Sequence, residues 1–236
     1  MEICSSIRTS LRTLLLEKYY TEIEEYDDIS TQKILSNKEA FLFLKQAIKN
    51  TSIRLGMDVF IGLNSKASSF YKDGKYKIKD FPSALTTEEL LNLYNELNKE
   101  LNFIYIEDPF SEDDWAGWQS LSSVYSQKYT IAGGDFTATN LQRLQLATSK
   151  KVINAIVIKP TQIGTIIESL AMAQASRAMG LKIIVSHRSN ETADDFISDF
   201  AVAVSSDYVK LGTLSRGENV SKYNRLLQIE NQLRVL

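Results

Sequence analysis

The sequence predicts an α/β fold, an incomplete TIM-type barrel of about six parallel strands joined by helical crossovers. Two observations support this prediction. Short apolar runs alternate with longer segments of helical periodicity, which is typical of parallel strands with helices between them. Each run also ends on a residue capable of chemistry, and active-site residues of (β/α) barrels gather at strand ends. The residues at the ends of the runs are Asp58, Glu107, Asp135, Lys159, His187 and Lys210.

Composition narrows the class of protein. The chain has 236 residues, of which 44% are hydrophobic, so it can bury a large core, and barrels near this length form single domains. A net charge of −2 argues against a nucleic-acid partner. No apolar run reaches ~18 residues, so we expect no membrane span. Cys4 is the only cysteine, which excludes an internal disulfide and fits a reducing compartment, so we expect a cytoplasmic protein.

The N-terminal part, residues 1–35, is predicted to be a separate segment ahead of a barrel over residues 36–236. Residues 5–20 carry apolar side chains on one helical face, which predicts a helix. Residues 21–34 are polar and acidic, which predicts a loop. The sequence Ser36-Asn-Lys-Glu39 is a capping-box pattern, so a second helix should begin there.

The barrel elements follow in alternation. Strands are expected at 53–60, 103–107, 129–133, 153–159, 182–186 and 207–210. Helices are expected at 86–102, 112–126, 139–149, 162–179, 192–205 and 217–235. Residues 65–80 should form a surface excursion that turns at Asp73-Gly74.

A set of short motifs, in order along the chain, carries a resemblance to a known family. The motifs are Gly56-Met-Asp58, Ile106-Glu-Asp-Pro-Phe110, Gln162-Ile-Gly164, Ser186-His-Arg-Ser189, Val209-Lys-Leu-Gly212 and Lys222-Tyr-Asn-Arg-Leu-Leu227. Each motif is short, but together they span the chain from about Ser36 to its end. By these motifs the chain resembles the enolase (phosphopyruvate hydratase) family, in its C-terminal barrel domain.

The resemblance implies a chemistry and a role for each matching residue. Enolases are Mg²⁺-dependent lyases of glycolysis that convert 2-phosphoglycerate to phosphoenolpyruvate, and their superfamily pairs a Lys or His base with one or two Mg²⁺ ions. Hard carboxylate oxygens suit Mg²⁺, and arginine suits a phosphate group. The implied roles are Lys159 as general base, Lys210 and His187 beside the substrate, Arg188 and Ser189 on its phosphate, and Asp58 and Glu107 on the metal.

The sequence departs from the family pattern at two functional positions. Gly134 stands where the family has its third metal carboxylate. The following Asp135 is predicted to point away from that position, because successive strand residues face opposite sides, unless a local bulge turns it inward. The family's general acid lies in an Asp-Glu-Gly-Gly loop that has no match here, and only Glu24, Glu25, Asp27 or Asp28 could replace it.

The resemblance also implies missing structure. We expect the separate N-terminal enolase domain and the first two barrel strands to be absent, which would leave two unpaired sheet edges. Such edges invite pairing with another chain, so a second copy or an unrelated subunit is expected to cover them.

Three interpretations remain open. The chain is a catalytically impaired subunit of an assembly, an active hydratase completed by another chain, or a fragment of a larger product. The first is favoured because Gly134 and the lost acidic loop both lie inside the part that this chain encodes. Magnesium binding is then weakened or lost, and pairing between the lysines and carboxylates is the alternative to a retained ion.

Overall fold

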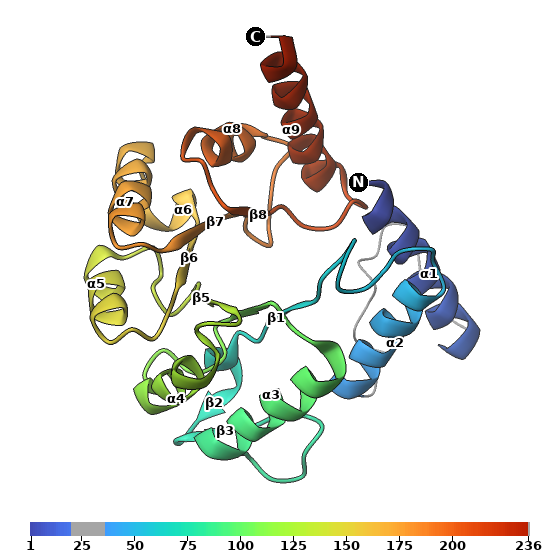
Figure 1. Ribbon diagram of the computed structural model, residues 1–236, viewed down its shortest axis with the longest axis vertical. Coiled ribbons are helices and arrows are strands. Elements are labelled where there is room, and N and C mark those ends of the chain that lie inside the picture. The colour runs from blue at the N-terminus through green and yellow to red at the C-terminus, as the bar shows by residue number, and fades with distance from the viewer. Residues whose placement is uncertain (20–35, 236) are drawn as a thin grey trace. The chain divides into compact units, whose positions relative to one another are not determined.

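The computed structural model describes residues 1–19 and 36–235 (Figure 1). The chain divides into two compact units. Unit 1 comprises Met1–Leu63 and Ser69–Tyr105, and unit 2 comprises Asn64–Ser68 and Ile106–Leu236. Each unit is described by itself. The predicted acidic loop 21–34, with its candidate acids Glu24, Glu25, Asp27 and Asp28, lies outside the described residues.

The sheet confirms the predicted fold class. Its six strands lie side by side in chain order, β1-β4-β5-β6-β7-β8, and the pairs from β5 to β8 are parallel. Helical crossovers between parallel neighbours are the construction of a (β/α) barrel. The strands are β1 (Gly62–Asn64), β4 (Tyr105–Glu107), β5 (Thr130–Gly133), β6 (Ala155–Ile158), β7 (Lys182–Ser186) and β8 (Tyr208–Lys210). The order leaves β1 and β8 as the two sheet edges.

The helices of unit 2 follow the predicted periodicity, with one division. They are α4 (Trp115–Tyr125), α5 (Leu141–Ser149), α6 (Pro160–Ile163), α7 (Ile166–Ala178), α8 (Phe196–Ala203) and α9 (Gly217–Val235). The predicted helix 162–179 is therefore two helices. The chain leaves α6 through Gly164, whose φ of 105° favours glycine, and the Thr165 side chain then caps α7 by accepting the Glu168 N–H.

Unit 1 contains the N-terminal helices and a hairpin. Its elements are α1 (Glu2–Tyr19), α2 (Asn37–Lys49), α3 (Thr87–Leu101), β2 (Tyr71–Lys72) and β3 (Lys75–Tyr76), with a 3-10 turn at Ala67–Phe70 on the unit boundary. Ser36 caps α2 as predicted, and Thr86 and Glu89 form a complete capping box on α3. The predicted turn at Asp73-Gly74 joins β2 to β3, with both residues at positive φ.

The predicted strand 53–60 is wrong. These residues form a turn closed by an isolated bridge between Leu55 and Val59, with Gly56 at a φ of 86°. The strand beside β4 is β1, which begins at Gly62. Asp58 therefore lies in a turn and not at a strand end.

The core of unit 2 is built around β6, whose residues Ala155–Ile158 are all buried. A parallel strand covered on both faces should be continuously apolar, as Ala-Ile-Val-Ile is. Beside the sheet, the Trp118 ring stacks on Phe136 with 4.1 Å between centroids. Over residues 1–19 and 36–235, no helix combines the length and apolarity that crossing a membrane requires.

Candidate functional site

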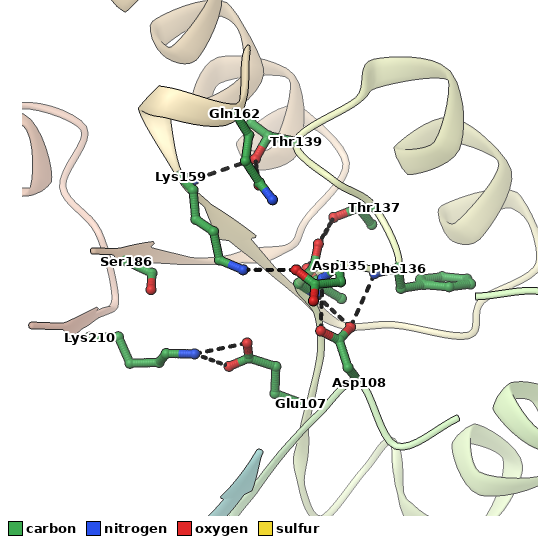
Figure 2. A network of polar contacts seen from close by, with 12 residues as sticks. Glu107, Asp108, Asp135, Phe136, Thr137, Thr139, Lys159, Gln162, Ser186 and Lys210 are labelled. Carbon is green, nitrogen blue, oxygen red and sulfur yellow. Dashed lines mark hydrogen bonds and ion pairs between the residues drawn. The ribbon is translucent and has the colours of Figure 1, made fainter. Parts of the chain in front are cut away.

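The carboxyl ends of β4 to β8 bring together most of the predicted site residues in unit 2 (Figure 2). Glu107 is the last residue of β4, Lys159 follows β6, and Lys210 is the last residue of β8. Because parallel strands end at the same edge of a sheet, residues far apart in the chain can meet there. Three ionic or hydrogen-bonded groups form at this edge.

Glu107 and Lys210 make the first group. Lys210 Nζ lies 2.8 Å from Glu107 Oε1 and 2.6 Å from Oε2, so the ammonium contacts both carboxylate oxygens. The Glu107 side chain is 1% exposed, and the Lys210 side chain is about one-third exposed. A buried carboxylate needs such a charged partner, because removing it from water without one is costly.

Asp135 and Lys159 make the second group, with 3.1 Å between Lys159 Nζ and Asp135 Oδ1. The prediction that Asp135 points away from the family's third metal-ligand position is corrected in one respect, because its carboxylate faces Lys159. It assumed strand alternation, but β5 ends at Gly133 and the chain then turns, so the alternation no longer applies. Figure 2 shows the Asp135 carboxylate facing the Lys159 ammonium.

The backbone at Lys159 is also held in place. Its N–H donates to Thr139 Oγ1 at 3.3 Å, and that hydroxyl donates to Gln162 Oε1 at 2.9 Å. The loop after β5 and the start of α6 are thus joined beside the candidate base.

Asp108 makes the third group and is a residue that sequence reasoning missed. Its carboxylate accepts the backbone N–H groups of Gly134 (2.9 Å), Asp135 (2.7 Å) and Phe136 (3.2 Å). Its own backbone has a φ of 45°, and its side chain is almost completely buried. Burial raises the pKa of Asp108 to about 6, against the lowering effect of the three N–H groups. Its position directly after Glu107 in the Ile106–Phe110 motif was the available signal.

Gly134 fits tightly between two carboxylates. A Cβ atom at this position would lie 2.7 Å from Asp108 Oδ2 and 2.8 Å from Glu107 Oε1. Both distances are shorter than an ordinary van der Waals contact of a Cβ atom. A side chain at position 134, including the carboxylate that the family pattern has there, would therefore have to displace the carboxylate of Glu107 or Asp108 from its present place.

His187, Arg188 and Ser189 follow β7. His187 N–H donates to the Lys210 carbonyl at 2.9 Å, while its Nδ1 atom is buried with no hydrogen-bond partner among the described residues. Burial lowers the pKa of His187, and the charges of Lys210, Lys222 and Lys159 act in the same direction. Arg188 and Ser189 are exposed.

Asp58 belongs to unit 1 and has a different environment. The Arg54 side chain donates to both of its oxygens at 2.8 Å, and the Arg54 N–H adds a third bond at 2.9 Å. These bonds lower the pKa of Asp58 to about 2. Its carboxylate is thus engaged in closing its own turn.

Asn64 occupies the strand end that Asp58 was expected to occupy. It is the last residue of β1, and the next residue, Ser65, donates its N–H to the Glu107 carbonyl at 3.0 Å. The sequence contains a signal for this, because Ile61-Gly-Leu-Asn64 repeats the pattern of Leu55-Gly-Met-Asp58. An amide at this place provides no negative charge for a cation.

These residues do not fit the expected Mg²⁺ ion. Glu107 and Asp135 each face a lysine ammonium, and Gly134 has no side chain to offer. Across the part of the chain that the structure describes, no group of three or more His, Cys, Asp or Glu side chains converges as a metal site would. Magnesium takes its ligands from carboxylates that are free to coordinate.

Comparisons with known proteins agree with the motifs. The model of the enolase C-terminal TIM barrel domain matches residues 1–235. The enolase of Aeropyrum pernix is 38% identical over 225 residues, which cover 94% of this chain and 52% of that protein. The chain thus spans about half the length of the curated relative that it matches. Together with the parallel sheet and its strand-end site, these matches show that the chain belongs to the enolase family.

Proposed function

We propose that this chain is a catalytically impaired enolase-family barrel that acts as a subunit of an assembly. The main support is Gly134, packed against Glu107 and Asp108 where a metal-binding carboxylate would have to stand. Glu107 and Asp135 each pair with a lysine, and the strand next to β4 ends on the neutral Asn64. A dianionic enolate formed next to a carboxylate needs concentrated positive charge from metal ions, which this donor set is not arranged to hold.

The state of Lys159 supports the same proposal. A general base must present a neutral amine near the proton that it removes. Lys159 Nζ lies 3.1 Å from the Asp135 carboxylate and donates a hydrogen bond to it, so the lysine is already engaged and would have to leave this partner to reach a substrate proton. The pair is thus a stable arrangement of the two side chains with no metal required.

A surface for assembly is available at β8. The sheet order places no described strand on the outer side of β8, and its residues Tyr208 and Val209 are 44% and 37% exposed. Exposed apolar side chains on an unpaired edge strand favour pairing with another chain. The partner would be a second copy of this chain or another subunit.

An active hydratase is the second candidate. Lys159, Lys210 and Glu107 keep the strand-end positions that the family pattern implies, and the chain covers 52% of its relative, so another polypeptide could supply the remainder. In this case the reaction would be the glycolytic dehydration of 2-phosphoglycerate to phosphoenolpyruvate, with Mg²⁺. Asp135 would have to leave Lys159 before that residue could act as a base.

A coupled assay for phosphoenolpyruvate formation at saturating Mg²⁺ separates the candidates. The purified chain is compared with Lys159→Ala, and with Lys128→Ala as a matched control because Lys128 is an exposed lysine outside the site. We expect no turnover by the unaltered chain above the Lys159→Ala background. Turnover that is lost in Lys159→Ala and retained in Lys128→Ala would refute impairment and favour the hydratase.

A further inference from the structure

Lys222 is a fully buried lysine outside the strand-end pairs. It lies in α9 and is 0% exposed to solvent. Its Nζ atom contacts three acceptors: the carbonyls of Glu218 (2.7 Å) and Thr192 (2.8 Å) and the Glu191 carboxylate (3.1 Å). Three acceptors satisfy the three N–H donors of an ammonium group, which makes its burial tolerable. Two of these acceptors belong to the loop after β7.

Glu191 connects this buried ammonium to the same loop. One of its oxygens faces Lys222, and the other accepts the backbone N–H of Arg188 at 2.8 Å. The loop is also held at its start, where the His187 N–H donates to the Lys210 carbonyl at 2.9 Å. The backbone from His187 to Thr192 is therefore fixed at its beginning, middle and end.

The fixed loop presents two side chains that are not otherwise engaged. Arg188 and Ser189 are exposed, and within the described residues their side chains make no hydrogen bond or ion pair. A guanidinium and a hydroxyl on consecutive residues are suited to an oxyanion such as phosphate. Fixing the backbone in advance reduces the entropy that binding would otherwise lose.

We propose that Lys222 and Glu191 are positioning residues, a buried ion pair that holds the His187–Thr192 loop so that Arg188 and Ser189 can grip an oxyanion without any metal. The proposal rests on the anion-binding role that the family resemblance implies for Arg188 and Ser189. It does not depend on whether the chain turns over substrate, since the pair lies on α9 and the β7 loop, apart from the Glu107 and Asp135 groups.

The single histidine provides a direct probe of the pair. His187 is the only histidine of the chain, so its imidazole signal in proton NMR is unambiguous. The charged groups that act on it are Glu191, Lys210, Lys222 and Lys159, and of these only Glu191 raises its pKa. Glu191→Gln should therefore lower the pKa of His187, and Lys222→Met should raise it. A change that merely loosened the fold would not produce shifts of opposite sign.

The test titrates the full chain with inorganic phosphate in the presence of a metal chelator, following the His187 signal. Chloride at equal ionic strength serves as the reference. Asp199→Asn is the matched control, because it breaks the ion pair of Asp199 with Arg225 on α9 without touching the loop. Arg188→Ala tests the ligand contact itself. Should Lys222→Met fail to fold, Glu191→Gln still removes the charge that joins the loop to α9.

We expect phosphate to shift the His187 signal of the unaltered chain and of Asp199→Asn equally. Glu191→Gln should weaken phosphate binding by about tenfold, by analogy with the loss when the residues that orient metal ligands are changed, and Arg188→Ala should abolish it. The proposal is overturned if the unaltered chain does not respond to phosphate, or if Glu191→Gln binds phosphate as well as the unaltered chain. Because no substrate is present, either result is independent of the turnover assay.

Discussion

Glu107 and Lys210 are 103 residues apart in the chain, yet the Lys210 ammonium contacts both oxygens of the Glu107 carboxylate. Their strands, β4 and β8, are separated in the sheet order by β5, β6 and β7. In a flat sheet, four steps of about 4.8 Å would place the strands roughly 19 Å apart, beyond the reach of the two side chains. The contact therefore requires the sheet of unit 2 to curve, as the wall of a barrel does.

Removing Lys210 should be more damaging than removing Glu107. Lys210→Met leaves the carboxylate of Glu107, 1% exposed, without its ammonium, which should lower the free energy of unfolding by about 3 kcal/mol. In Glu107→Gln the lysine left behind is partly exposed and can be hydrated, so the loss should be about 1 kcal/mol. Urea unfolding of both variants measures the difference.

The double variant tests whether these two losses come from one interaction. Lys210→Met with Glu107→Gln should lose less than the sum of the single variants, because neither charge of the pair is left without its partner. Lys99→Met is the control, since its pair with Glu96 is largely exposed and should change the free energy of unfolding by less than about 0.5 kcal/mol. Additive losses at Glu107 and Lys210 would argue that the pair is not energetically coupled.

Gly134 should not tolerate even one extra methyl group. Gly134→Ala would place Cβ within 2.8 Å of two carboxylates that are themselves held by Lys210 and by the backbone of the 134–136 loop. We expect a loss of about 1–3 kcal/mol in the free energy of unfolding, as for other overpacked sites. Gly217→Ala is the matched control because no atom lies within 4 Å of its Cβ, and thermal or urea unfolding compares them. Equal stability of the two variants would contradict the tight fit.

Asp108 should make the fold less stable as pH rises from about 4 to about 6. Its pKa is about 6 in the folded chain and 3.8 ordinarily, so in this range the folded state holds a proton that the unfolded state has lost. The stabilisation is complete below the ordinary pKa and disappears as pH rises through the folded pKa, an effect on the order of 3 kcal/mol.

Urea unfolding of Asp108→Asn at a series of pH values measures this contribution. Because the amide does not ionise, the decline in the free energy of unfolding between pH 4 and 6 should vanish. Asp199→Asn provides a control of opposite sign. Arg225 lowers the pKa of Asp199, so that residue adds stability above about pH 4 and loses it as pH falls further. Identical pH profiles for Asp108→Asn and the unaltered chain would refute the raised pKa.

The β8 edge should control assembly. Val209→Lys puts a charge on the exposed edge strand, and such charges are known to block edge pairing. If a second copy pairs at this edge, sedimentation at micromolar concentration should show an oligomer for the unaltered chain and a smaller species for the variant. Val124→Lys, on the exposed face of α4, should leave the oligomer unchanged. A monomeric unaltered chain would exclude self-assembly and leave only an unrelated partner.

The strand ends could largely be predicted from the sequence because each central strand is a short apolar run. Strand β7 spans the predicted residues 182–186, and β6 lies within the predicted 153–159. Helix starts were predictable for a similar reason, since caps such as Ser36 and Thr86 act on the backbone three residues ahead. These are local interactions, and neighbours in sequence suffice to determine them.

The position of the first strand could not be predicted from local sequence. The patterns ending at Asp58 and at Asn64 are nearly the same, and both satisfy the rule of a short apolar run before a polar residue. The choice depends on backbone pairing, in which Ser65 and Ala67 bond to the carbonyls of Glu107 and Asp108. Those partners are some forty residues away, so no local pattern reveals them.

By itself the sequence determined the family, the alternation of strands and helices, and the residues Glu107, Lys159 and Lys210 at the strand ends. The tertiary structure decided how these residues are used. It turned Asp135 toward Lys159, joined Glu107 to Lys210, and placed Asp108 beneath the 134–136 loop. The reason is physical: hydrophobic periodicity is a property of consecutive residues, whereas the partner of a buried charge is set by strand order and curvature, which bring distant residues together.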